Sequence, residues 1–385
     1  MITQARSGLR DLPFNPGPAP DSPLLRPIPL GFQESDAMNV WTVDDNQLGE
    51  LARNWNASLR EPVRPAATDD FKVCMMWIDS QVTFCNPDMP LFCSGGTGLG
   101  AAEDVARAAR YIYQNMDYIT EIDCTLDTHY RHAIFHQDFW LDQQGNHPPM
   151  YTLIMPDDVA SGRWVPAPAV TWAAYGNMMW MRKVQRHVIQ YTNLLAARGR
   201  YPLIIWPQHA KLGNVEHALA PMLYEAVEWH SAVRGTNTMY EIKGADIFFE
   251  MYSALSPEVE RTDEIEPMEG VNTKFLERLL AFDMVIAAGE AASHCFAWTI
   301  DDMLHHRLMV QDPALARKFV VLTDCTSSVV LRNPATGQII PGTPDNPTDF
   351  RPMAEAAFQG FEAAGMRIVT TNTPIPEIPG YGVRS

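Results

Sequence analysis

Short apolar runs alternate with amphipathic stretches over most of the chain. The runs that predict strands cover residues 72–79, 118–125, 203–206, 238–243, 284–288, 318–323 and 366–370. Apolar residues at helical spacing predict helices over 48–59, 99–116, 175–198, 216–233, 273–281 and 353–364, and another that begins near Ser293. Strands that alternate with helices indicate a parallel sheet with right-handed crossovers. The pattern therefore predicts an α/β fold with a doubly wound parallel sheet in a single main domain.

Both ends of the chain and one internal segment depart from this alternation. Residues 1–70 are rich in proline and carry one modest helical stretch, so we expect an N-terminal extension that wraps the body or a partner subunit. The main domain covers residues 71–375, and residues 376–385 form a C-terminal tail. A helical insertion at about 143–202 interrupts the main domain. We expect this insertion to cover the functional site or to mediate homo-oligomer formation.

A cluster of large apolar side chains lies inside the insertion, at Met178, Met179, Trp180 and Met181. Methionine commonly fills irregular gaps in apolar cores. We interpret the cluster as the buried face of the helix predicted over residues 175–198.

Composition limits the classes of partner and the compartment. A formal net charge of -17 argues against nucleic acid, because phosphate binding needs clustered lysine and arginine. No apolar run approaches the ~18 residues of a membrane span, and no charged-then-apolar leader opens the chain. The six cysteines form no CxxC pair, which is typical of reduced thiols. We expect a cytoplasmic protein without a membrane or nucleic-acid partner.

Residues that can carry chemistry follow the predicted strands at their C-terminal ends. They are Asp79, Asp127 with His129, His209, Lys243 and Cys295. Ligands of open α/β sheets bind at this edge. We therefore expect these side chains to form one site.

Cys295 stands at a predicted helix start, where the backbone N–H groups and the helix dipole favour a thiolate over a thiol. This position predicts a nucleophile, although an isolated cysteine is commonly a small buried hydrophobe. The adjacent His294 is a poor candidate for its base, because neighbouring helical side chains point in different directions. We expect His294 to pack or to cap the helix.

Asp79 and Lys243 each end a predicted strand. Asp79 could take the thiol proton as a general base, or it could simply cap the following turn. Lys243 could orient Asp79 and stabilise the thiolate, or it could be a solvated strand end.

Asp127, His129 and His209 provide one carboxylate and two imidazoles, a set that leaves open positions on a metal ion. The alternative is a group of independent surface residues. Zn2+ is our first expectation, and Fe2+ and Mn2+ also suit these ligands. His132 and His136 are both candidates for a further ligand, and their spacing does not decide between them.

A glycine-rich segment at residues 95–100, GGTGLG, is similar to part of a dinucleotide-binding fingerprint. That fingerprint needs a tight turn from a strand directly into a helix. Here a polar loop separates the segment from the preceding strand, so we interpret the glycines as a flexible loop before a helix.

Taken together, five segments resemble the isochorismatase-like cysteine hydrolases, and among them the nicotinamidases. The segments are IDSQVTFC at 78–85, TLDTH at 125–129, WPQH at 206–209, IKGADIFFEMYSAL at 242–255 and AAGEAASHC at 287–295. They occur in the family's order, and the resemblance covers about residues 70–375.

The resemblance implies roles for individual residues. Asp79, Lys243 and Cys295 would form a catalytic triad, and Asp127, His129 and His209 would hold the metal. A cis peptide at Glu290-Ala291 would place the backbone N–H groups of Ala291 and Cys295 as an oxyanion hole. Phe84, Trp206 and Tyr252 match aromatic positions of the substrate pocket.

The implied function is a cysteine amidohydrolase that cleaves a carboxamide through a thioester, with nicotinamide converted to nicotinate and ammonia. Glu290, the extension, the insertion and the tail depart from compact nicotinamidases. The alternatives are a related C–N hydrolase that acts on a carbamoyl group or a larger amide, and a non-catalytic metal-binding or scaffold protein.

Overall fold

The computed structural model describes residues 22–333, 335–343 and 347–383. Its centre is a six-stranded sheet with the order β10-β9-β8-β1-β2-β7, and every neighbouring pair is parallel. From β1 the chain builds outward to β2 and β7 on one side, then returns to β8 and continues to β9 and β10 on the other. The predicted doubly wound parallel sheet is confirmed.

The strands of this sheet are β1 (Val73–Ile78), β2 (Glu121–Asp127), β7 (Met239–Lys243), β8 (Met284–Gly289), β9 (Phe319–Leu322) and β10 (Arg367–Val369). Every residue of β1 and β8 is buried, because helices cover both faces of the sheet. Their sequences, VCMMWI and MVIAAG, contain no charged residue for the same reason.

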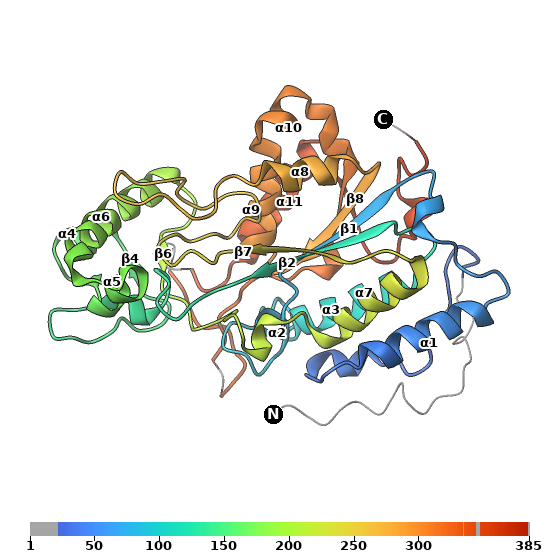
Figure 1. Cartoon of the computed structure of the whole chain (residues 1–385), viewed down its shortest axis with the longest axis horizontal. Coiled ribbons are helices and arrows are strands. Elements are labelled where there is room, and N and C mark those ends of the chain that lie inside the picture. Colours follow the sequence, from blue (N-terminus) through green and yellow to red (C-terminus); the bar gives the residue numbers. More distant parts are fainter. Residues whose placement is uncertain (1–21, 334, 344–346, 384–385) are drawn as a thin grey trace.

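Helices form a layer on each face of the sheet (Figure 1). One layer contains α3 (Gly100–Gln114) and α7 (Pro221–Arg234), with α1 (Asp45–Ser58) outside α7; α2 (Val82–Cys85) leads from β1 toward it. The other contains α8 (Thr273–Leu280), α9 (Cys295–His305), α10 (Arg307–Gln311) and α11 (Arg351–Ala363). Among the described residues, no helix combines the length and the apolar character that a membrane span needs.

Part of the proline-rich N-terminal region packs on the body of the protein. Helix α1 buries Leu48, Ala52 and Trp55, and the Trp55 ring meets Trp229 of α7 edge to face at 5.9 Å between centroids. Residues 1–21 of the predicted extension lie outside the described residues, as do residues 384–385 of the predicted tail.

The insertion lies beyond one end of the sheet (Figure 1). It contains α4 (Pro156–Ala160), α5 (Pro168–Tyr175), α6 (Met181–Arg198), β4 (Leu153–Ile154) and β5 (Val165–Pro166). Two small antiparallel pairs join it to its flanking residues: β5 pairs with β3 (Trp140–Leu141), and β4 pairs with β6 (Leu203–Ile204). Our prediction that residues 203–206 form a strand of the main sheet is therefore wrong. Both β6 residues are buried, and a buried two-stranded ribbon has the same apolar sequence as a short central strand.

The prediction that Met178–Met181 form a buried helical face is also wrong. Helix α5 ends at Tyr175, the following Gly176 has the left-handed conformation, and a short 3-10 turn precedes α6. The cluster therefore lies at a junction between helices, where Met179 is 84% exposed and Trp180 is 47% exposed. Lys183 lies over the Trp180 ring at 5.4 Å.

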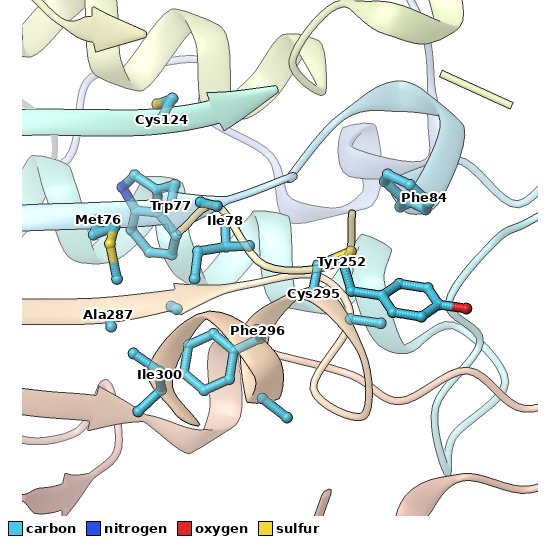
Figure 2. Close-up of a cluster of buried hydrophobic side chains, with 14 of the residues drawn as sticks. Met76, Trp77, Ile78, Phe84, Cys124, Tyr252, Ala287, Cys295, Phe296 and Ile300 are labelled. Atoms are coloured by element: carbon cyan, nitrogen blue, oxygen red, sulfur yellow. The ribbon is translucent and has the colours of Figure 1, made fainter. Parts of the chain in front are cut away.

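One hydrophobic core leads from the middle of the sheet to the edge where the candidate residues lie. Met76, Trp77 and Ile78 of β1 are buried in it with Phe296 and Ile300 of α9. Figure 2 shows Cys295 at the end of this cluster. The core thereby fixes the start of α9 relative to the end of β1.

Replacing Trp55 with alanine tests how much α1 contributes to stability. Because Trp55 is buried, we expect Trp55→Ala to lower the free energy of unfolding by about 3–5 kcal/mol, measured by urea denaturation. The matched control is Trp172→Ala, whose side chain is 63% exposed and should contribute little. Equal effects of the two substitutions would contradict the packing role of α1.

Candidate active site

The candidate residues meet at the point where the strand order of the sheet reverses. Asp79 directly follows β1 and Cys295 begins α9 after β8; these two strands are neighbours, but the chain builds outward from them in opposite directions. Asp127 and Lys243 are the last residues of β2 and β7 and are paired in register. This is the topological switch point, the place where open α/β sheets bind ligands.

A glycine makes the approach of β1 and β8 possible. Gly289 has a φ of +113°, and a Cβ there would lie 2.1 Å from the Ile78 carbonyl oxygen. The Glu290 N–H donates to the same carbonyl at 2.6 Å. A side chain at position 289 would therefore push apart β1, which leads to Asp79, and β8, which leads to Cys295.

Lys243 is at the centre of the site and is only 1% exposed. Its Nζ lies 2.9 Å from Asp79 Oδ2 and 2.9 Å from Asp127 Oδ1, and donates to the Met251 carbonyl oxygen at 3.1 Å. The Cys295 Sγ lies 3.7 Å from the same nitrogen. One ammonium group thus contacts the candidate base, the candidate nucleophile and a candidate metal ligand.

Burial and neighbouring charges shift the pKa values of Lys243 and Asp79. Burial would lower the pKa of Lys243, but the charges of Asp127 and Asp79 raise it well above the usual value. Burial raises the pKa of Asp79, and the Lys243 charge opposes that rise. The Thr125 hydroxyl donates to Asp79 Oδ1 at 2.5 Å and fixes the orientation of the carboxylate.

Cys295 is the first residue of α9, as predicted, but its resting form differs from the expected thiolate. Burial raises the pKa of the thiol well above its usual value, and the charges of Asp79 and Asp127 raise it further. The Lys243 charge opposes these effects without cancelling them. Desolvation therefore outweighs the stabilisation that Lys243 gives the thiolate, and the thiol needs a base to ionise it.

The turn before Cys295 has the predicted cis peptide at Glu290-Ala291. Within the described residues, the backbone N–H groups of Ala291 and Cys295 donate no hydrogen bond to protein, whereas the Ala292 N–H donates to the Ser327 carbonyl oxygen at 2.9 Å. Two donors are therefore available beside the Sγ atom, as an oxyanion hole requires.

A small cavity of about 30 Å3 adjoins the cysteine. Its lining includes all three predicted aromatic residues, Phe84, Trp206 and Tyr252, together with Ala291 and Cys295. The Trp206 Nε1–H donates to the Tyr252 hydroxyl at 3.1 Å and joins two sides of the wall. The lining next to the thiol is mostly apolar.

His294 also lines this cavity, and its ring stacks on Tyr201 at 4.6 Å between centroids. Its side chain does not cap α9. Burial lowers the pKa of His294 to about 3, so the ring is neutral. The expectation that His294 packs is confirmed, and the alternative of a cap is wrong.

Asp127, His129 and His209 form a buried group whose potential ligand atoms all lie within 4.8 Å of one another. Asp127 Oδ2 is 2.7 Å from His129 Nε2 and 3.7 Å from His209 Nε2. Burial would raise the pKa of Asp127, but the charges of His129 and Lys243 hold it below its usual value. Burial lowers the pKa of His209 to about 3, so this imidazole is neutral.

The hydrogen bonds of the two imidazoles fit a metal ion. Carbonyl oxygens only accept, so His129 Nδ1–H donates to Gly244 at 2.9 Å and His209 Nδ1–H donates to Pro207 at 2.8 Å. Both Nε2 atoms lie near Asp127 Oδ2, and each is an acceptor whenever its ring carries no second proton. These acceptors repel one another unless a cation or a proton lies between them, and a divalent cation suits this donor set.

A second glycine gives the backbone access to this group. Gly244 has a φ of +76°, and a Cβ there would lie 2.8 Å from Asp127 Oδ1 and 2.9 Å from His129 Cε1. The Gly244 carbonyl can therefore reach the His129 ring.

Neither of the two open candidates joins the metal-ligand group among the described residues. His136 is buried behind His209, with its Nε2 3.4 Å from His209 Nδ1. His132 directs its Nδ1 to the Asp138 carbonyl oxygen at 3.4 Å. The protein thus offers three ligands, and the remaining positions would be open to small molecules.

Sequence reasoning missed Glu250 and Thr125 as members of the site. Glu250 lines the cavity, and its Oε2 has no hydrogen-bond partner in the described part of the chain. The Glu250 N–H donates to the Tyr191 hydroxyl of α6 at 2.9 Å. Both missed residues lie inside matched segments, TLDTH and IKGADIFFEMYSAL, which was the signal available for finding them.

The glycine-rich segment at 95–100 has a packing role. A Cβ at Gly100 would lie 2.4 Å from the Ser327 Oγ, and one at Gly95 would lie 2.9 Å from the same atom. The glycines let this loop approach residue 327, which agrees with our rejection of a dinucleotide site.

No protein-family model matches the chain, and a search of curated proteins finds no match. Solved structures of nicotinamidases and pyrazinamidases are similar. The nicotinamidase/pyrazinamidase of Acinetobacter baumanii is 16% identical, with 79% of this chain and 99% of that chain covered and a TM-score of 0.44. The yeast nicotinamidase Pnc1p bound to nicotinaldehyde is 14% identical, with 77% and 99% covered and a TM-score of 0.43.

A pyrazinamidase of Pyrococcus horikoshii in complex with zinc is 14% identical, with 78% of this chain and 99% of that chain covered and a TM-score of 0.37. These identities and TM-scores carry no argument about chemistry. The roles of residues in this chain therefore rest on the geometry of its own site.

Removing an imidazole tests the metal group. After loading with Zn2+ and dialysis, we expect about one ion per unmodified chain and a loss of most bound zinc in His209→Ala, because two ligands hold zinc weakly. The measurement is elemental analysis, and His305→Ala, on an imidazole that lies on the surface, is the control. Equal zinc content in both variants would rule out His209 as a ligand.

Proposed function

We propose that this chain is a cysteine amidohydrolase that cleaves a carboxamide through a thioester, with nicotinamide as its first candidate substrate. The observation that carries the proposal is the contact of one buried ammonium, Lys243, with both Asp79 and the Cys295 sulfur. Base, nucleophile and stabilising cation meet beside free backbone N–H donors and a mostly apolar cavity. Each is a part that thiol-based acyl transfer requires.

In the first half of the reaction, Asp79 takes the proton of the Cys295 thiol and the sulfur attacks the carbonyl carbon of the amide. The negative charge that develops on the carbonyl oxygen is stabilised by the N–H groups of Ala291 and Cys295. Asp79 then gives its proton to the amide nitrogen, the C–N bond breaks and ammonia leaves. The acyl group remains on the sulfur as a thioester.

In the second half, a water molecule replaces ammonia. Asp79 accepts a proton from this water while the water oxygen attacks the thioester carbon. The C–S bond then breaks, the acid product forms, and the proton returns to the thiolate of Cys295. Lys243 keeps Asp79 oriented and offsets the negative charge of the buried site in both halves.

Asp127, His129 and His209 would hold a divalent cation at one side of the cavity. When bound, such a cation offers an open coordination position to a donor atom of the substrate, as a ring nitrogen would provide. Phe84, Trp206 and Tyr252 would enclose a flat ring between this position and the thiol. An aromatic carboxamide with a ring nitrogen therefore matches the donor groups and the aromatic lining of the site best.

Several features of the whole protein stay predictions. They are the cytoplasmic location, the homo-oligomer, and the division into the extension at 1–70, the domain at 71–375 and the tail at 376–385.

Substituting the nucleophile tests the function. We expect wild-type protein to release ammonia from nicotinamide, and Cys295→Ala to lower kcat at least about 1000-fold because no thioester forms. Cys124→Ala, which removes a buried thiol from β2, is the matched control. A panel of carbamoyl compounds and larger amides runs in parallel. If the wild type hydrolyses compounds of the panel but not nicotinamide, nicotinamide is ruled out as the substrate. If Cys295→Ala is as active as wild type, the thioester mechanism is refuted.

Substituting the base gives a second test. Asp79→Asn keeps the shape of the side chain but cannot accept the thiol proton, so we expect kcat to fall by about 100- to 10,000-fold with KM changed far less. Steady-state kinetics on the best amide of the panel provide both constants. A variant that keeps wild-type kcat would exclude Asp79 as the base.

A further inference from the structure

Two buried carboxyl side chains that the proposed reaction does not use lie at the turn formed by residues 290–295. This turn, hereafter the oxyanion turn, carries the proposed oxyanion donors. Glu290, directly before Ala291, is 1% exposed, and Asp104 of α3 is 3% exposed. The two carboxyl groups are close enough to interact directly, and a hydrogen bond between them requires a proton on one of the two acids. Neither residue lines the catalytic cavity, so Glu290 faces the body of the protein and not the substrate.

The pair is tied to the turn through the segment that follows β9. The Ser327 N–H donates to Glu290 Oε2 at 3.1 Å, and the Ser327 carbonyl accepts from the Ala292 N–H at 2.9 Å. On the other side, Arg107 Nη2 donates to Asp104 Oδ1 at 2.6 Å. Glu290 therefore connects the oxyanion turn to α3 and to residue 327.

The hydrogen-bond donors and acceptors around Glu290 and Asp104 favour one proton on the two carboxyl groups. Asp104 Oδ2 is buried and accepts no hydrogen bond from the described residues while both acids are written as carboxylates. A proton on Glu290 provides a donor for the Asp104 carboxylate, while Glu290 Oε2 stays free to accept from Ser327. One shared proton satisfies the group, whereas two ionised carboxylates would repel each other without water to screen them.

The electrostatic directions agree with this count. Burial raises the pKa of Glu290 well above its usual value, and the charge of Asp104 raises it further. Burial also raises the pKa of Asp104, to about 6, against the hydrogen bonds from Ser327 and Arg107. These directions favour a proton on Glu290 and a negative charge on Asp104.

We propose that Glu290 is a positioning residue, which holds the oxyanion turn in its active geometry by donating its carboxyl proton to Asp104. The inference rests on the proposed function, since the turn carries the Ala291 N–H that would bind the oxyanion. Glu290 acts through the backbone and touches no reacting atom. A displacement of about 1 Å in such a donor can lower kcat 100-fold.

Other titratable groups surround the pair on each packed element. They are Arg107 on α3, Cys85 at the end of α2, Cys93 in the loop that follows, and Asp324 and Cys325 after β9. Burial raises the pKa of all three thiols well above the usual value, so they stay neutral over the range of the test.

Two substitutions at position 290 separate the shared proton from simple packing. Glu290→Gln keeps a donor for Asp104 and an acceptor for Ser327, so kcat should stay within about threefold of wild type. Glu290→Leu fills similar volume but leaves both partners unpaired, so kcat should fall about 10- to 100-fold with KM within about threefold. Glu355→Leu, on the exposed side of α11, is the control.

The pH profile provides a readout that packing alone would not change. In wild type the shared proton leaves as pH rises, and the two carboxylates then push the turn away from α3. The glutamine amide cannot lose its proton, so the alkaline fall in kcat should move to higher pH in Glu290→Gln. If kcat falls at the same alkaline pH in Glu290→Gln and in wild type, the shared proton between Glu290 and Asp104 is ruled out.

Hydrogen exchange of the peptide that contains residues 291–296 tests the same inference without any substrate. We expect exchange about tenfold faster in Glu290→Leu, and unchanged in Glu290→Gln and Glu355→Leu. Wild-type exchange and kcat in Glu290→Leu, or an equal loss in Glu290→Gln, would overturn the proposal. If the wild type hydrolyses no amide, the proposed function fails while the exchange experiment still decides whether the pair holds the turn.

Discussion

A buried ammonium group with two carboxylate partners is the interaction on which the site depends. Burying Lys243 or either aspartate alone would be costly, because each would lose its hydration without a compensating charge. Together they satisfy one another at 2.9 Å. The contact also joins β7, an edge strand with exposed residues, to the end of β1 in the middle of the sheet.

Much of the fold could be predicted from the sequence, because buried parallel strands are short apolar runs and polar residues follow them at one edge. The places of Asp79, Lys243 and Cys295 at that edge follow from this pattern. The partners of Glu290 could not be predicted in this way, since Asp104 lies on a helix distant in sequence. The exposed Met179 and the separate ribbon of β6 were misassigned for a related reason: apolar sequence alone does not reveal what an element packs against.

The insertion supports the substrate side of the site. His187 and Tyr191 of α6 are buried, and their side chains hydrogen-bond the backbone of Phe248 and Glu250. The loop they hold has no regular structure and carries Glu250 and Tyr252 to the cavity. The shape of the pocket therefore depends on a segment outside the six-stranded sheet, whereas the thiol, the base and the lysine depend on the sheet itself.

The tight aromatic wall beside Cys295 has a kinetic consequence. The cavity of about 30 Å3 is far below the roughly 300–1,000 Å3 of ordinary small-molecule pockets, and an organic amide needs more space than it offers. Such a molecule reaches the sulfur only while a side chain of the wall has moved aside, so internal motion, and not diffusion alone, limits how often it arrives. The same wall leaves Cys295 only 7% exposed, which limits contact between the sulfur and solvent oxidants between turnovers.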